Sequence, residues 1–196
     1  MNDILLNNDE EDLKFLNLQD REYQKITINN KTISNSDFTK VNLIDSKSNN
    51  TYFEKVIFNN CDLSNFKFMD SSLREVEFNN CKLLGTYFNN CHLTKVTINS
   101  SLAKYLNIAD SKIKELTIKD TNMEDGSFYN NELSKVIFTN NNFTKSDFYK
   151  TSLAGIDFSS CDITSIKVTQ ESLKGIKVNT LQALELIKLF DIDIIE

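Results

Sequence analysis

Residues 56–93 carry a large apolar residue at every fifth position. The register continues in both directions: of the 31 positions reached in steps of five from Ile28 to Val178, 29 are Ile, Leu, Phe, Met or Val, and only Ser48 and Ala103 depart. A spacing this regular is an internal repeat, and an internal repeat predicts a solenoid in which each unit packs on its neighbours.

The five-residue spacing fits neither a long helix nor a long strand. On a helix it advances the side chain by roughly 140°, so the apolar residues would spiral around the axis. On a straight strand, every second one would point to the opposite face. The pattern is satisfied if each block of five is a short extended side followed by a corner. The first and third residues then face inward, the second and fourth face water, and the fifth turns the chain.

The number of sides per coil follows from a second recurrence. Every fourth block begins with a bulky aliphatic residue, as at Val56, Val76 and Val96, whereas small residues such as Thr51, Ser71 and Cys91 begin another set of blocks. A recurrence at every fourth block therefore predicts four unlike sides per coil. The predicted core includes Phe58, Leu63, Phe68, Leu73, Phe78, Leu83, Phe88, Leu93, Phe138 and Phe158.

The centre of many blocks reads Asn-Leu, Asp-Leu or Asp-Phe, as at 42–43, 62–63, 147–148 and 157–158. This pattern resembles the pentapeptide repeat proteins and covers about four fifths of the chain. The resemblance implies an all-β fold, a right-handed quadrilateral β-helix. It says little about function, because the repeat residues form the scaffold.

Composition agrees with a narrow solenoid. There is no proline, which would remove a donor from the ladder between coils. Asparagine recurs at one corner (Asn60, Asn80 and Asn140), where it tolerates a left-handed conformation and its amide can bond along the stack. No signal peptide or apolar run of membrane length occurs, so we expect a cytoplasmic protein without membrane contact.

The four cysteines all begin blocks and are predicted to be small core residues. The spacing of Cys61 and Cys81, one coil apart, does not exclude a disulfide. The one histidine, His92, has no paired ligand spacing, so no metal site and no cofactor are predicted. The cysteines are Cys61, Cys81, Cys91 and Cys161.

The chain divides into three parts. Residues 1–24 hold seven acidic and two basic residues and place Glu11 and Arg21 at inward positions, which predicts an irregular acidic lead-in and N-terminal cap, with the first 10 or so residues mobile. Residues 25–178 form the β-helix of about eight coils. Residues 179–196 form a helix, capped by Asn179 or Thr180, and a short alternating strand.

The predicted helix, 179–190, has one polar stripe, made by Gln182, Glu185 and Lys188. Its remaining apolar surface is wider than one core contact needs. One side can plug the last coil, and the rest requires a second surface. We therefore predict a homodimer through the C-terminal end; the alternative is a monomeric cap. The predicted interface residues are Leu184, Ile187, Phe190, Ile192 and Ile194.

Residues 172–178, Gln182-Ala183 and 192–195 resemble the C-terminal end of the Qnr and MfpA type of pentapeptide repeat protein. That resemblance implies tail-to-tail dimers that imitate duplex DNA, bind DNA gyrase or topoisomerase IV, and protect them from quinolones. In such a dimer the partner-binding residues would be Glu185, Asp191, Asp193 and Glu196.

The charge pattern fits DNA mimicry poorly along the coils. A rod of two such chains would replace roughly 45 phosphate charges of B-DNA. Residues 25–178 instead contain 19 basic and 17 acidic residues, and the acidic excess lies at the two ends of the chain. Mimicry is therefore expected only at the joint between two chains.

No catalytic pattern is present: there is no glycine-rich phosphate loop, and no nucleophile accompanies the lone histidine. Direct nucleic-acid binding is not expected, because Glu54, Glu75, Glu115 and Glu132 interrupt the most basic side. Two non-enzymatic functions remain, a topoisomerase-binding DNA mimic and a repeat scaffold that binds another protein.

Overall fold

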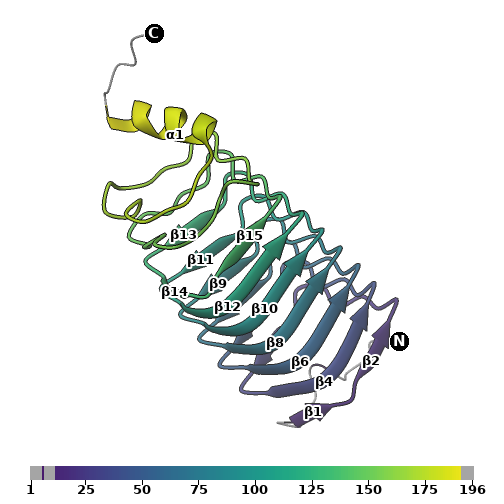
Figure 1. Ribbon diagram of the computed structural model, residues 1–196. Coiled ribbons are helices and arrows are strands. Elements are labelled where there is room, and N and C mark those ends of the chain that lie inside the picture. Colours follow the sequence, from purple (N-terminus) through teal and green to yellow (C-terminus); the bar gives the residue numbers. More distant parts are fainter. Residues whose placement is uncertain (1–5, 7–11, 191–196) are drawn as a thin grey trace.

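The computed structural model describes residue 6 and residues 12–190, the side chain of Phe190 excepted. This part of the chain is a parallel β-solenoid of about six regular turns, followed by one C-terminal helix (Figure 1). Strands return after four blocks of the repeat, so that Val56 pairs with Val76 and Val76 with Val96. The predicted solenoid and its period of four blocks are confirmed.

Two parallel sheets form three of the four sides. The nine-stranded sheet is built on long strands, such as β6 (Tyr52–Asn59), that bend around a corner and so cover two adjacent sides. The six-stranded sheet covers a third side. On the fourth side, single β-bridges join equivalent residues of successive coils. The series begins with Glu22 and Asn42 and ends with Asn142 and Asp162. The other strands are β1 (Asp12–Lys14), β2 (Asn17–Gln19), β3 (Thr27–Asn29), β4 (Thr32–Thr39), β5 (Lys47–Asn49), β7 (Lys67–Met69), β8 (Ser72–Asn79), β9 (Tyr87–Asn89), β10 (His92–Asn99), β11 (Asn107–Ala109), β12 (Lys112–Lys119), β13 (Ser127–Tyr129), β14 (Glu132–Ser134) and β15 (Ile137–Thr139).

The corners have a left-handed backbone. Every fifth residue from Phe15 to Gly155 has a positive φ near 50–80°, a conformation that costs an ordinary L-residue about 1–2 kcal/mol and is most accessible to Gly, Asn and Asp. At several corners an asparagine Nδ2 donates to the Oδ1 of the residue one coil earlier. Asn140, one of the three asparagines expected to bond along the stack, donates to Asp120 over 3.1 Å in this way. The other such pairs are Asn50 to Asn30, Asn65 to Asp45, Asn90 to Asp70 and Asn130 to Asp110.

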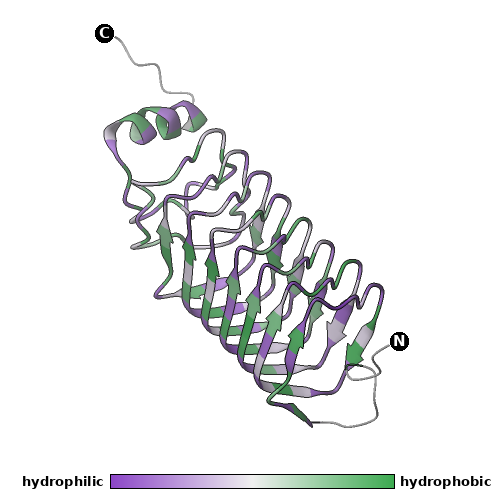
Figure 2. Ribbon diagram, turned by 90° about the vertical axis from the view of Figure 1, so that its right-hand side faces the viewer, coloured by the Kyte–Doolittle hydropathy of each residue, from purple (hydrophilic) through white to green (hydrophobic). Residues whose placement is uncertain are grey.

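The core is a thin column of stacked side chains along the axis. The ring centroids of Phe58 and Phe78 lie 5.1 Å apart and nearly parallel, and those of Phe68 and Phe88 lie 4.6 Å apart. Polar residues alternate with these apolar ones along the strands (Figure 2). All ten core residues named from the sequence are at most 4% exposed: Phe58, Leu63, Phe68, Leu73, Phe78, Leu83, Phe88, Leu93, Phe138 and Phe158.

All four cysteines are buried and unpaired with one another. Burial raises the pKa of the Cys91 thiol to about 11, so this thiol is neutral and unreactive at physiological pH. The cysteines therefore act as small apolar core residues, as their block positions indicate.

The β-helix begins earlier than the boundary expected at residue 25. β1 and β2 already pair with β4 in the same register of four blocks, Leu13 with Ile33 and Leu18 with Phe38. Arg21 stands at a first place yet is exposed, so one charged residue at an inward place does not disrupt this first coil. The prediction of an irregular lead-in is wrong for residues 12–24. Apart from Leu6, which is buried, residues 1–11 lie outside the described part.

Candidate functional site

The C-terminal end is closed by helix α1 (Thr180–Ile187) and the short 3-10 helix η2 (Lys188–Phe190), which lie across the last coil (Figure 1). Asn179 is the N-cap: its side chain accepts from the backbone N–H of Gln182, and the Gln182 side chain accepts from the backbone N–H of Asn179. This reciprocal capping box satisfies two N–H groups that a helix start leaves free. The predicted cap at Asn179 is confirmed.

The side of α1 that meets the coil differs from the expected one. Gln182 is only 8% exposed, and its Nε2 donates to the backbone oxygens of Phe158 at 2.9 Å and Cys161 at 2.6 Å. Leu186, one turn later, is 8% exposed and belongs to the hydrophobic core. The predicted polar stripe of Gln182, Glu185 and Lys188 is therefore not uniform, because Gln182 is buried while Glu185 and Lys188 are exposed. No further coil follows the last one to donate hydrogen bonds to its carbonyl oxygens. The side-chain amide of Gln182 donates to them instead.

Replacing Gln182 by Ala should lower the free energy of unfolding by about 1–3 kcal/mol, because the buried carbonyl oxygen of Cys161 loses its donor, while that of Phe158 keeps only the backbone N–H of Cys161. Chemical denaturation followed by circular dichroism measures this. Lys188→Ala removes an exposed side chain from the same end and should change stability by less than about 0.5 kcal/mol. Equal effects of the two substitutions would contradict the role given to Gln182.

With Gln182 and Leu186 facing inward, α1 and η2 present apolar side chains to solvent. Leu181 is 75% exposed, Leu184 38% and Leu189 47%; we call these three residues the exposed leucines. Ile187 is half-buried. Of the predicted dimer residues, Leu184 thus lies on an open surface, whereas Ile192, Ile194 and the side chain of Phe190 lie outside the described part.

The predicted acidic group is only partly described. Glu185 is exposed, and its Oε1 lies 2.7 Å from the Nζ of Lys188. Asp191, Asp193 and Glu196 lie outside the described residues.

Charges on the sides of the solenoid pair from coil to coil. Cations and anions at equivalent places of successive coils lie within salt-bridge distance, for example Lys104 and Glu124 at 2.8 Å. The hydrogen bond from Lys104 lowers the pKa of Glu124, so this carboxylate stays ionised. Each exposed pair adds little stability, but the pairing leaves the sides with alternating charge. The other pairs are Arg74 with Glu54, Lys82 with Asp62, Lys95 with Glu75 and Lys135 with Glu115.

One aromatic cluster stands on the side formed by the six-stranded sheet. The rings of Tyr129 and Tyr149 stack with centroids 5.9 Å apart, and the Lys150 ammonium lies 5.6 and 5.7 Å from them. These two outward tyrosines therefore pack along the stack and against Lys150.

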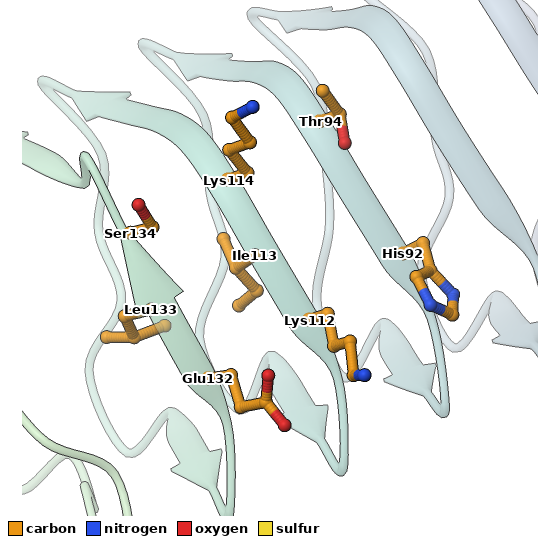
Figure 3. A pocket seen from close by; sticks show the side chains of 8 residues that line it. All are labelled: His92, Thr94, Lys112, Ile113, Lys114, Glu132, Leu133 and Ser134. Atoms are coloured by element: carbon orange, nitrogen blue, oxygen red, sulfur yellow. The ribbon is translucent and has the colours of Figure 1, made fainter.

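A shallow groove of about 380 Å³ crosses the outer surface of β10, β12 and β14 (Figure 3). Sequence periodicity gave no sign of it, because its residues follow the regular repeat. Its lining residues are His92, Thr94, Lys112, Ile113, Lys114, Glu132, Leu133 and Ser134.

Neither the groove nor the helix end contains a recognisable catalytic arrangement. Across residues 6 and 12–190 there is no group of three His, Cys, Asp or Glu side chains that could hold a metal ion. Within the same residues, no helix is long and apolar enough to cross a membrane. The geometry is that of a repeat solenoid whose distinctive surfaces lie toward its C-terminal end.

Comparison with known proteins agrees with this class. A profile of the pentapeptide repeat region matches residues 51–128, and a profile of eight pentapeptide repeats matches residues 120–164. Together they span more than half of the 196 residues. The chain belongs to the pentapeptide repeat family.

Solved structures with the same repeat resemble the chain at low identity. A trypsin-treated variant of QnrB1, a plasmid-mediated fluoroquinolone resistance protein, is 18% identical over 94% of this chain and 100% of its own, with a TM-score of 0.37. HetL, a pentapeptide repeat protein involved in heterocyst differentiation regulation in the cyanobacterium Nostoc, is 14% identical over 86% of this chain and 91% of its own, with a TM-score of 0.23. At these values the likeness carries no functional argument. No curated protein sequence matches the chain.

Proposed function

We propose that this protein is a non-enzymatic binding protein that acts as a homodimer joined at its C-terminal end. The observation that carries the proposal is the set of exposed leucines on α1 and η2, at the end of a rod whose sides carry charges paired from coil to coil. Apolar side chains grouped on one surface favour burial against a partner. A two-fold axis would pack each helix against the same helix of a second copy, with Leu184 and Ile187 in the contact and Phe190, Ile192 and Ile194 beside it.

DNA gyrase or topoisomerase IV is the partner class that the sequence favours. The support is the resemblance of residues 172–195 to the C-terminal end of Qnr and MfpA type proteins. A two-fold contact at α1 would bring both copies of Glu185, Asp191, Asp193 and Glu196 to the centre of the rod. This concentration of carboxylates complements a basic surface.

The paired charges limit how far the rod can imitate DNA. B-DNA carries about one negative charge per 1.7 Å, whereas the sides here alternate in sign from coil to coil. Contacts with a topoisomerase would therefore be confined to the central joint. The same pairing favours a second candidate function, a scaffold that binds a different protein through its neutral sides.

A gyrase supercoiling assay with the intact chain, with and without ciprofloxacin, separates the two functions. The topoisomerase proposal expects inhibition or protection at micromolar protein, weakened by Glu185→Lys and unchanged by Glu77→Gln on a remote side. No effect of the intact chain on either reaction would reject that proposal and leave the scaffold.

A further inference from the structure

The stacked rings of Tyr129 and Tyr149 are followed by a threonine rather than a third ring. β-Bridges join residues 127, 147 and 167, so Tyr129, Tyr149 and Thr169 occupy equivalent places of three successive coils. The two rings lie 19° from parallel with centroids 5.9 Å apart, which covers one face of Tyr149. The short side chain of Thr169 cannot continue the stack on the other face. Tyr149 is 46% exposed, and we call this second side of its ring the open ring face.

The backbone pairing between coils lapses beside the open ring face. At three earlier corners the N–H donates over 3.1 Å to the carbonyl oxygen 19 residues later: Asn90 to Ala109, Asp110 to Tyr129 and Asn130 to Tyr149. Between Lys150 and Thr169, both of which the structure describes, the equivalent bond is absent. The last coil is therefore not held against its neighbour at this corner.

The same coil contains one extra residue. In earlier coils the first residue of a block donates its side chain to the carbonyl oxygen 23 residues earlier, as Thr151 does to Phe128 over 2.6 Å. In the last coil Ser172 makes this bond, to Phe148, 24 residues earlier, over 3.4 Å. Glu171 stands at the first place but is exposed, whereas Ser172 is buried. An extra residue opposite a neighbouring segment is a β-bulge, which re-aims side chains, and here it turns Glu171 outward.

A shallow pocket of about 460 Å³ lies where these irregularities meet. Pockets that bind small ligands have volumes of roughly 300–1,000 Å³. Tyr149 lines the pocket and Tyr129 does not, so the pocket borders the open ring face. Its lining residues are Tyr149, Lys150 and Ser152 from one coil and Thr169, Glu171 and Ser172 from the next.

The polar groups of the pocket favour a neutral ligand that both donates and accepts hydrogen bonds. The backbone N–H of Glu171 itself and the Thr169 hydroxyl lower the pKa of the Glu171 carboxyl, so this group is ionised at neutral pH and acts as an acceptor. The Lys150 ammonium lies 3.4 Å from the Tyr129 hydroxyl and acts as a donor. One cation and one anion leave the lining without net charge. A phosphate-bearing ligand would be repelled by Glu171.

We propose that this pocket binds a saccharide, with one pyranose ring stacked on the open ring face of Tyr149. The C–H groups on one face of a pyranose carry partial positive charge and complement the negative face of an aromatic ring. Its hydroxyl groups project from the ring edge, where they can pair with Glu171, Lys150 and the hydroxyls of the pocket. An apolar ring would stack as well but would leave these polar groups without hydrogen bonds. The site lies on the side of the rod and is independent of the proposed dimer.

Amide NMR spectra of the full chain, recorded during titration with sugars, test the inference. The ligands are the methyl glycosides of glucose, galactose and N-acetylglucosamine, each added to about 20 mM, because a contact with one ring is expected to have a dissociation constant of about 1 mM. At least one glycoside should shift the amides of Tyr149, Thr169 and Glu171 in a saturable way.

Three variants locate the binding. Tyr149→Ala should raise the dissociation constant about 10-fold by removing the stacking surface. Glu171→Gln keeps the shape of the side chain and should raise it about 5-fold, because a charge-assisted acceptor is lost. The matched control is Tyr105→Ala: this tyrosine is 59% exposed at a different corner, also has a lysine over its ring, and should leave the dissociation constant unchanged.

The remaining outcomes would overturn the inference. No saturable shift with any of the three glycosides would remove the saccharide site. Binding that is unchanged in both Tyr149→Ala and Glu171→Gln would place the sugar elsewhere on the chain. Adenosine monophosphate serves as the comparison ligand, and shifts of the same amides by this nucleotide but by none of the glycosides would show that the pocket takes a phosphate-bearing ring.

Discussion

Phe78→Asp is expected to abolish folding. Phe78 is fully buried, with its ring stacked on Phe58 and edge-on to Phe68 and Phe88. A carboxylate in this column has no partner for its charge, and the cost of burying it exceeds the roughly 5–15 kcal/mol by which a domain is stable. Circular dichroism should show no β-sheet spectrum and no cooperative thermal transition.

Two milder variants allow the contribution of Phe78 to the free energy of unfolding to be measured. Phe78→Ala should fold but lose about 3–5 kcal/mol, from lost burial and the cavity left behind. Glu77→Ala, one residue away on the outer face, should lose less than about 0.5 kcal/mol. A Phe78→Ala protein as stable as the wild type would mean that the aromatic column does not hold the coils together.

Leu181→Asp combined with Leu184→Asp should convert the proposed dimer to a monomer. These side chains are 75% and 38% exposed in the single chain, so charging them costs the fold little but places four carboxylates in the proposed two-fold contact. Light scattering at about 10 μM, a protein concentration at which a micromolar dimer is mostly associated, should give twice the 22.6 kDa chain mass for the wild type and 22.6 kDa for the variant.

The matched control is Lys188→Gln, which removes the charge of an exposed residue on the same end without touching the leucines. It should remain dimeric. A wild-type protein of 22.6 kDa would favour the alternative, a monomeric cap.

Much of the fold could be read from the sequence because a solenoid repeats one local rule. The five-residue spacing fixes which side chains point inward, and the recurrence at every fourth block fixes which of them stack, as Phe58 does on Phe78. The corners could also be predicted from the sequence, because Asn at the fifth place of a block tolerates a left-handed φ and can bond along the stack. Asn140 does so with Asp120.

The two ends of the solenoid were harder to predict, because a terminal coil lacks a neighbouring coil that would pair with its backbone hydrogen-bonding groups. The sequence placed Gln182 in one polar stripe with Glu185 and Lys188, whereas its amide lies inside and donates to the buried carbonyl oxygens of Phe158 and Cys161. The absence of β-bridges between residues 131–140 and residues 151–160 was also invisible in the sequence, because these residues keep the phase of the repeat. At the other end, the acidic composition of residues 1–24 concealed the first coil.

The register of four blocks per coil is the central claim, and a disulfide cross-link tests it most directly. Thr97 on β10 lies opposite Thr117 on β12, and neighbouring parallel strands are about 4.8 Å apart, within disulfide reach. Thr97→Cys with Thr117→Cys should close a disulfide under mild oxidation, while Thr97→Cys with Lys119→Cys, two residues out of register, should stay reduced. Closure of the second pair in place of the first would contradict the solenoid.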